Sequence, residues 1–275
     1  MRRPAIALII VGVLVVPFTG RTQSSSLAAA RLHASVGIDS GGVFTYRYIV
    51  ENGARSTAGV GKLAIDISLP MGVARAGDPI GVSAPQPGWR AIVGTDATAR
   101  WEAIQDASLV LPNHTLAGFS IASHGSPALG RFTLSPRIDP DRAPVMSPGD
   151  DPGDVDRYNQ DLARYVASQS VEGVTITPSA SVTATPETEL TNLINQVVRA
   201  RALGWISNDA IMRSLRAKLE SARGALSRRQ FEMAQNILST LRNEVAAQSG
   251  KSVTSEAVAL VDVNIQYVLQ LAAKR

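Results

Sequence analysis

The most regular hydrophobic pattern of the chain lies between Leu190 and Leu271. Apolar residues recur there at intervals of three and four, which is the spacing of one buried helix face. Four runs follow one another: Leu190, Leu193, Ile194, Val197 and Val198; Ile211, Leu215, Leu219, Ala222 and Leu226; Phe231, Ala234, Ile237, Leu238, Leu241 and Val245; and Val258, Val261, Ile265, Val268 and Leu269. Because short connections join them, they predict a small antiparallel four-helix bundle at about residues 186–273.

From about residue 34 to residue 137 the pattern has a period of two, which is the spacing of half-buried strands. Aromatic and β-branched residues are frequent, and Gly, Pro, Asn or Asp separate the runs. The predicted strands are residues 43–50, 63–69, 89–93, 98–103, 108–111, 115–122 and 129–134. Short strands with turn residues at about every tenth position favour an antiparallel β-sandwich at residues 31–137.

The N-terminus indicates export. Two arginines precede an uncharged apolar run, Ala5 to Phe18, and small and polar residues follow it. This order is typical of a secretory signal peptide, which we assign to residues 1–30. The apolar run is shorter than the roughly twenty residues of a membrane span, and a retained N-terminal anchor is the alternative. Cleavage after Ser24, or after one of Ala28 to Ala30, fits the small-residue rule.

Composition narrows the class of protein. The chain has no cysteine, which excludes disulfides and thiolate metal sites. An exported protein without disulfides is typical of bacteria, so we expect a secreted or periplasmic bacterial protein. The formal net charge of +4 is too small to favour a nucleic-acid partner, which needs a dense basic face. No later stretch is apolar for about eighteen residues, and no further membrane span is predicted.

Residues 138–185, rich in Pro, Asp, Ser and Thr, are predicted to connect the two modules. They contain a possible short helix at 154–168 and a possible strand at 174–176. Thr185 followed by proline is an N-cap signal for the first helix of the bundle. Gly204 is expected to end that helix in the left-handed conformation. Ser207 or Asn208 is expected to cap the next helix.

Residues at these helix boundaries and within the helices resemble those of a known domain family. The matching motifs are Gly204-Trp205-Ile206-Ser207-Asn208, Ser214-Leu215, Lys218-Leu219, Ala222, Ala225-Leu226, Ala234, Leu238 and the run from Val245 to Lys251. In this order they resemble the FIMAH-type domain, a small all-helical module at the C-terminus of many secreted or surface bacterial proteins. The resemblance covers about residues 188–268 and implies an accessory, non-catalytic module. One departure is Ser227-Arg228-Arg229, where the family usually carries a glycine in the turn.

The N-terminal half shows a weaker resemblance. Its signs are Tyr46-x-Tyr48-x-Val50-x-Asn52, Pro87-Gly88-Trp89 and Leu116-x-Gly118-Phe119-Ser120. These motifs resemble β-sandwich domains of uncharacterised bacterial exported proteins.

Acidic residues of the connector are possible calcium ligands, because Ca²⁺ prefers oxygen donors. They are Asp139, Asp141, Asp150, Asp151, Asp154 and Asp156. Their spacing does not fit the twelve-residue calcium loop, and a solvated linker uses the same residues. His33, His114 and His124 do not supply the converging set that a zinc site needs. We therefore assign no metal or cofactor.

Three other groups of residues are candidates for catalysis or sugar binding. Ser123-His124-Gly125-Ser126 contains a possible nucleophile, but it lacks the strand–turn–helix elbow, and a loop is the simpler interpretation. Paired carboxylates for glycoside hydrolysis could come from Asp66, Glu102 and Asp106, whose separation the sequence does not fix. Trp89 and Trp101 could form a sugar-stacking platform or fill the core, and the core is favoured.

The helical module carries more basic than acidic residues. Five arginines, Arg213, Arg216, Arg223, Arg228 and Arg229, could form a basic flank for an anionic cell-wall polymer or lipid headgroups. A solvated helix face with i,i+4 pairs such as Arg216 with Glu220 is the favoured alternative.

The sequence therefore predicts a non-catalytic secreted protein that binds a cell-surface or extracellular ligand, glycan or protein, through the sandwich. The alternative is a secreted hydrolase with its active site on the sandwich and the helical module appended. No catalytic residue is assigned.

Overall fold

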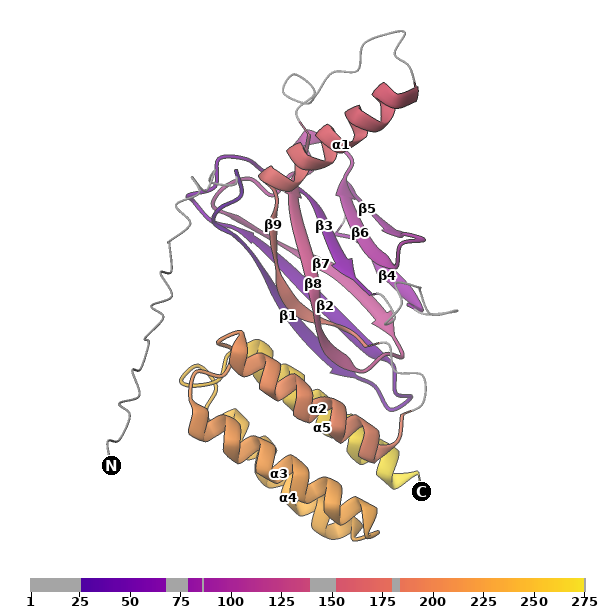
Figure 1. Cartoon of the computed structure of the whole chain (residues 1–275), viewed down its shortest axis with the longest axis vertical. Coiled ribbons are helices and arrows are strands. Elements are labelled where there is room, and N and C mark those ends of the chain that lie inside the picture. The colour runs from indigo at the N-terminus through magenta and orange to yellow at the C-terminus, as the bar shows by residue number, and fades with distance from the viewer. Residues whose placement is uncertain (1–25, 68–78, 86, 139–151, 180–183, 275) are drawn as a thin grey trace, which may run out of the picture.

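The structure is a computed structural model that describes residues 26–67, 79–85, 87–138, 152–179 and 184–274. Within these residues it contains two antiparallel sheets and five α-helices (Figure 1). The side chains of residues 152 and 154 are outside the description.

The two sheets form a β-sandwich-like fold. The four-stranded sheet has the order β1-β2-β7-β4, and the five-stranded sheet has the order β5-β6-β3-β8-β9. All neighbouring strands pair antiparallel. The strands are β1 (Ala30–Ile38), β2 (Phe44–Asn52), β3 (Val60–Asp66), β4 (Gly81–Ser83), β5 (Trp89–Val93), β6 (Thr98–Ala103), β7 (His114–Ser123), β8 (Pro127–Pro136) and β9 (Val171–Pro178).

Most predicted strands are present, with differences at the ends of the sandwich. Residues 108–111 do not form a strand; a short 3-10 helix, Asp106–Ser108, and one bridge between Val60 and Val110 lie there instead. β1 and the three-residue β4 were not predicted. The possible strand at 174–176 is β9, which pairs with β8 along eight residues and extends the five-stranded sheet beyond residue 137.

Aromatic side chains fill the space between the sheets. Trp101, Tyr48 and Phe119 are completely buried, and Trp89 is 3% exposed. The ring of Phe119 lies edge-on to both tryptophans, with centroid separations of 5.0 Å to Trp89 and 5.9 Å to Trp101. Large aromatic rings contribute most to core burial, and edge-to-face contacts are a favoured arrangement. These residues are therefore the centre of the sandwich core.

Five helices are described: four lie in the stretch predicted as a bundle, and one lies in the connector, where a possible short helix is predicted at residues 154–168. α1 (Pro152–Gln169) lies in the connector, at the end of the sandwich away from the other helices (Figure 1). The remaining four, here called the helical module, are α2 (Pro186–Ala202), α3 (Asp209–Ser227), α4 (Phe231–Ala247) and α5 (Ser255–Ala273).

The helix boundaries follow from local chemistry. Thr185 caps α2 in a capping box with Thr188, and Asn208 rather than Ser207 caps α3. Gly204 follows α2 with φ +77°, the left-handed conformation that glycine adopts without a steric penalty. The turn between α3 and α4, where the FIMAH-type family usually carries glycine, contains Arg229 with φ +58°.

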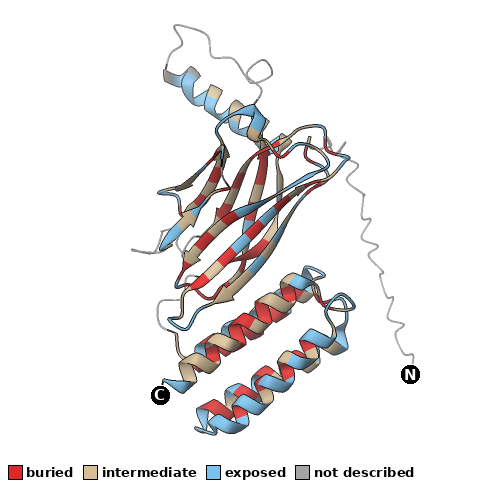
Figure 2. Ribbon diagram, turned by 180° about the vertical axis from the view of Figure 1, so that it is seen from behind, coloured by how far each residue is buried: buried red, intermediate tan, exposed pale blue. Residues whose placement is uncertain are grey.

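The helical module packs directly on one end of the sandwich. α2 and α5 lie between the sheets and the outer helices α3 and α4, and they carry buried residues along much of their length (Figures 1 and 2). Tyr267 of α5 meets Phe44 edge-on with a centroid separation of 5.0 Å. Apolar residues of both parts belong to one continuous core.

Buried hydrogen bonds fix the same interface. Asn264, 3% exposed, donates from Nδ2 to the carbonyl oxygen of Pro127 at 2.9 Å. The Ser126 hydroxyl donates to Glu189 Oε2 at 2.8 Å, and Gln196 Oε1 accepts from the Leu129 amide at 3.1 Å. Buried polar groups are costly unless they are paired, so these bonds favour one orientation of the module.

Candidate binding site

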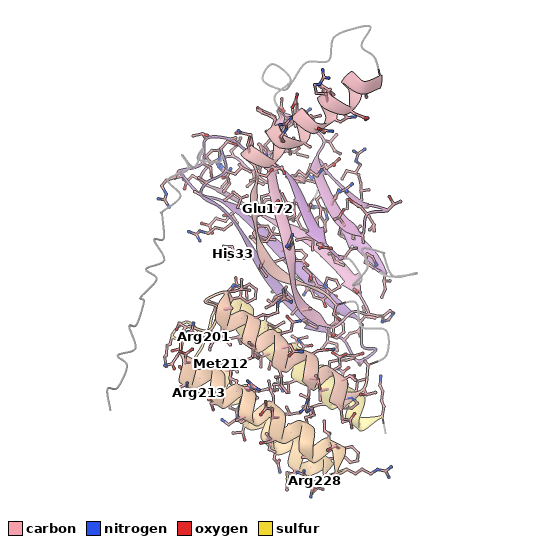
Figure 3. All side chains as sticks on the ribbon, in the orientation of Figure 1. His33, Glu172, Arg201, Met212, Arg213 and Arg228 are labelled. Carbon is pink, nitrogen blue, oxygen red and sulfur yellow. The ribbon has the colours of Figure 1, made fainter. Side chains whose placement is uncertain are left out.

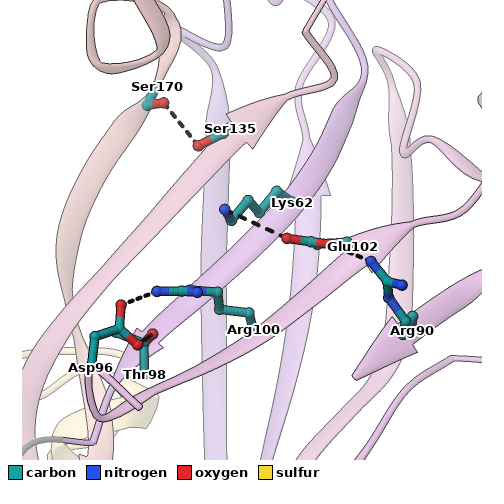
Figure 4. Close-up of polar contacts among 8 residues, drawn as sticks. All are labelled: Lys62, Arg90, Asp96, Thr98, Arg100, Glu102, Ser135 and Ser170. Atoms are coloured by element: carbon teal, nitrogen blue, oxygen red, sulfur yellow. Dashed lines mark hydrogen bonds and ion pairs between the residues drawn. The ribbon is translucent and has the colours of Figure 1, made fainter. Parts of the chain in front are cut away.

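The outer face of the five-stranded sheet carries rows of polar side chains. Cross-strand pairing places Ser135, Lys62, Glu102 and Arg90 in one row across β8, β3, β6 and β5. Glu102 lies between two cations, 3.0 Å from the Arg90 Nη2 atom and 3.6 Å from the Lys62 Nζ atom (Figure 4). Partial burial raises the pKa of Glu102, but the Arg90 hydrogen bond and both positive charges outweigh it and lower the pKa below its ordinary value.

The next row contains a small residue at its centre. Ala64 pairs with Arg100 of β6 on one side and with Thr133 of β8 on the other, and Thr133 pairs with Glu172 of β9. Ala64 alternates with the buried Leu63 and Ile65, so its methyl group lies on the outer face. Because a methyl group is shorter than its neighbours' side chains, it forms the floor of a depression.

This depression is a hollow of about 340 Å³ on the sheet surface. We call it the sheet hollow. Its lining is formed by Ala64, Asp66, Asp96, Thr98, Arg131, Phe132, Thr133 and Glu172. Four of these residues carry a charge, and they come from four separate parts of the sequence. Figure 3 shows Glu172 on β9 at the edge of this sheet.

The acidic side of the sheet hollow is ordered by local contacts. The Thr98 hydroxyl donates to Asp96 Oδ1 at 2.7 Å, and the Arg100 guanidinium contacts Asp96 Oδ2 (Figure 4). Asp96 lies in the turn between β5 and β6, where Ala97 has φ +56°. These contacts therefore hold the Asp96 carboxylate and the Thr98 hydroxyl in place.

The lining of the sheet hollow contains both hydrogen-bond donors and hydrogen-bond acceptors. The carboxylates of Asp66, Asp96 and Glu172 accept, the Arg131 guanidinium donates, and the threonine hydroxyls do both. A ligand with many hydroxyl groups also donates and accepts, so the lining is complementary to it. A cationic ligand would meet the Arg131 guanidinium, and an anionic ligand would meet the three carboxylates.

Two other hollows are less suited to recognition. One lies beneath α1 and is lined by Ser26, Tyr165 and Gln169 among others, with Arg137 as its charged member. The other is lined in part by Asp106 and Arg137, which form an ion pair at 2.8 Å. Among these three hollows of the described residues, the sheet hollow is the one in which several charged side chains from different strands surround one space.

Both tryptophans considered for a sugar platform are core residues. Trp101 is completely buried, and its indole N–H donates to the Ser83 carbonyl oxygen at 2.7 Å. The indole N–H of Trp89 donates to the Ser108 carbonyl oxygen at 2.8 Å. The platform interpretation is wrong, because neither ring is available at the surface. Trp205 is partly buried at the α2–α3 connection.

The candidate carboxylates for hydrolysis are separated. Asp66 lines the sheet hollow, whereas Glu102 belongs to the ion-pair row and Asp106 pairs with Arg137. In Ser123-His124-Gly125-Ser126, the Ser123 hydroxyl oxygen accepts the Gly125 amide at 2.9 Å and stabilises a turn. Sequence reasoning missed Arg131 and Glu172, because their convergence depends on strand register.

The histidines and connector aspartates do not converge in the described residues. His114 and His124 are exposed at opposite ends of β7, and His33 lies on β1, 2.9 Å from Glu51 (Figure 3). Asp156 is exposed on α1, the Asp154 side chain is not described, and Asp139, Asp141, Asp150 and Asp151 lie outside the described residues. Within the described ranges, no three His, Asp or Glu side chains are grouped to hold a metal ion.

Comparison with known proteins finds a distant likeness to a solved structure. A solved structure similar to this chain is an uncharacterized protein from Nocardia farcinica whose crystal structure reveals an immunoglobulin-like fold. The identity is 15%, the match covers 55% of this chain and 98% of that chain, and the TM-score is 0.31. No protein-family model and no curated protein matches the chain. None of the helices in the described ranges has the length and apolarity to cross a membrane.

Proposed function

We propose that this is a non-catalytic binding protein whose sandwich takes up a polyhydroxylated ligand, a glycan of a cell surface or the extracellular medium, in the sheet hollow. The observation that carries this proposal is the convergence of Asp66, Asp96, Arg131 and Glu172 around the small Ala64. Binding sites are concave and contain a few polar groups that fix the ligand's orientation. A flat apolar surface would instead favour a protein partner.

The hydrogen-bonding pattern supports a neutral, hydroxyl-rich ligand over an ion. Since carboxylates and a guanidinium line the same space, hydroxyl groups find both donors and acceptors. Because Trp89 and Trp101 are buried, recognition in this hollow rests on hydrogen bonds rather than on stacking against these two rings. Charge-assisted hydrogen bonds are worth about 1.5–3 kcal/mol each, enough for one side chain to affect affinity measurably.

The test is binding of the protein to a glycan array and to isolated cell-wall polysaccharides, followed by calorimetry on the best ligand. Asp66→Asn and Arg131→Gln should each weaken binding about tenfold or more, because about 1.4 kcal/mol corresponds to a factor of ten. Arg47→Gln is the matched control, because Arg47 is exposed on β2 of the opposite sheet. Unchanged affinity in both hollow variants would contradict the proposal. Cleavage of the polysaccharide would favour the hydrolase alternative instead.

We further propose that the helical module is an accessory antiparallel four-helix bundle of the FIMAH type. The capping at Asn208 and the left-handed glycine at Gly204 support this assignment. Arg229 occupies, with positive φ, the turn in which that family usually carries glycine.

We propose that the protein is exported, with cleavage after Ser24 in preference to Ala28–Ala30. Leu27 is completely buried, and the Ser26 carbonyl oxygen accepts the Thr57 amide at 2.8 Å. Cleavage after one of the three alanines would remove Leu27 from the core, whereas cleavage after Ser24 retains it. Mass determination of the exported protein tests this: a chain that begins after Ala28 would contradict it.

A further inference from the structure

The turn between α3 and α4 combines positive charge with exposed apolar side chains. Arg228 and Arg229 form the turn, and Phe231 and Met233 lie in the first turn of α4. Phe231 is 39% exposed and Met233 is 50% exposed. Arg223, one helical turn before the end of α3, is also exposed and donates to the Thr191 hydroxyl at 3.1 Å. We call these five residues the helical tip.

The three arginines of the helical tip form no ion pair within the described residues. Four other cations of the module do, whereas Arg199, Arg213 and Lys251 also form none among these residues. The pairs are Arg201 with Asp209, Arg216 with Glu220, Lys218 with Glu244, and Arg242 with Asp262. The stretch from residue 223 to residue 233 contains one carboxylate, Glu232, and three arginines, so its net charge is positive. The favoured solvated-face interpretation therefore describes Arg216 and not the helical tip.

The backbone of the turn gives a second, independent observation. Arg229 adopts φ +58°, a conformation that favours glycine and is disfavoured for a long side chain. The turn is held by amide bonds from Arg229 to Leu226 O at 2.9 Å and from Gln230 to Ala225 O at 2.9 Å. A backbone outlier maintained by its surroundings is a pointer to function. Here a guanidinium stands at the apex where the smallest residue would fit without strain.

We propose that the helical tip docks the protein on an anionic phospholipid surface. Arginines near such a surface are attracted by its phosphate groups, and exposed aromatic and thioether side chains enter the boundary of the acyl chains. The two exposed apolar residues favour lipid over a soluble anionic polymer, which would need the charges alone. Figure 3 places Arg228 at the end of the outer helical layer, remote from the sandwich. Docking there leaves the sheet hollow free.

Sedimentation with lipid vesicles tests the proposal. The chain from Ser26 to Arg275, which holds all described elements, should bind vesicles of equal parts phosphatidylcholine and phosphatidylglycerol but not phosphatidylcholine alone. Because each basic residue contributes about 1 kcal/mol near an anionic surface, Arg228→Gln with Arg229→Gln should weaken binding about thirtyfold. Phe231→Ser with Met233→Ser should weaken it as well. Arg229→Gly suits the positive φ of the turn and removes the whole arginine side chain with its charge.

The matched control is Arg199→Gln with Arg213→Gln, which changes net charge equally at the other end of the module. These residues are exposed, and Figure 3 shows Arg213 far from Arg228. The control should bind vesicles as the parent does, and thermal melts should show all variants folded. Equal weakening by control and tip variants would overturn the proposal, as would absence of binding to the phosphatidylglycerol vesicles. Binding to soluble poly(glycerol phosphate) without vesicle binding would assign the tip to a polymer and overturn the lipid assignment.

Discussion

The outer faces of the two sheets share one architecture and differ in chemistry. The five-stranded sheet presents charged residues, including Arg90, Glu102, Arg131 and Glu172, around the sheet hollow. The outer face of the four-stranded sheet carries charged residues on β1 and β2, namely Arg31, Arg47 and Glu51, and mostly small or neutral residues on β7 and β4. Its outward positions include Ser35, Thr45, Ser83, Ser120 and Ala122.

The difference between the two outer faces shows that the alternation of buried and accessible residues identifies the solvent-facing side of a sheet, but not a binding site. Both sheets alternate buried and accessible residues, as half-solvated antiparallel sheets do. A site additionally needs a small residue surrounded by convergent polar groups, which Ala64 and its neighbours provide. We therefore expect substitutions of inward-facing residues to change stability. Substitutions on the outer face of the five-stranded sheet should instead change ligand binding.

The largest expected effect is on the inward face. Trp101→Ala should lower the free energy of unfolding by about 3–5 kcal/mol, because it removes a completely buried ring. It also leaves the Ser83 carbonyl oxygen without its indole donor. Urea unfolding followed by circular dichroism measures the change. A loss below about 1 kcal/mol would place the ring at the surface and reverse the assignment of faces.

The end of the sandwich that α2 and α5 cover should be sensitive as well. Asn264→Ala removes donors to the Pro127 and Leu260 carbonyl oxygens, and should cost about 1–3 kcal/mol. Asn243→Ala, at an exposed position of α4, is the control and should stay within about 0.5 kcal/mol. Equal effects of the two variants in the same urea experiment would show that the interface does not depend on this bond.

The two outer faces can be compared by filling each with a ring. Ala64→Phe should occupy the sheet hollow and reduce ligand affinity more than tenfold, while the free energy of unfolding changes by about 0.5 kcal/mol. Ala122→Phe places the same ring on the outer face of the four-stranded sheet. It should leave affinity unchanged in calorimetry. If Ala122→Phe abolished binding and Ala64→Phe did not, the ligand would bind the four-stranded sheet, which would contradict the proposed site.

The smallest effect concerns the ion-pair row. Since the pKa of Glu102 is lowered in the folded protein, its charged form contributes stability above the ordinary carboxyl pKa of 4.5. That contribution is lost as the pH falls through the lowered pKa. For a solvent-screened pair we expect about 0.2–1 kcal/mol at neutral pH.

Comparing Glu102→Gln with the parent in urea at several pH values measures this contribution. The difference should shrink on acidification, and a difference that grows would contradict the sign.

Much of the fold could be predicted from sequence periodicity. Alternation at Phe44–Asn52 and heptad-like spacing at Asp209–Ser227 both correspond to observed elements. β1 was missed although Leu32, Val36 and their neighbours alternate, because it directly follows the small residues assigned to the signal peptide. β4 has three residues, too few for a periodic signal.

The interface and the site were beyond sequence reasoning for a different reason. Asn264 looks like an ordinary polar helix position until the helix is placed against Pro127. Likewise, Asp66 is separated by more than a hundred residues from Glu172, and only the register of β3, β8 and β9 places both beside Ala64. Local pattern determines which way a side chain faces, whereas convergence is a property of the assembled sheets.

The most direct test is amide NMR of the isotope-labelled protein during titration with the polysaccharide fraction that binds most tightly. We predict that chemical-shift changes centre on Ala64, Thr133 and Glu172, on the outer face of the five-stranded sheet. Changes centred on Thr45, Ser120 and Ala122 would place the ligand on the four-stranded sheet and contradict it.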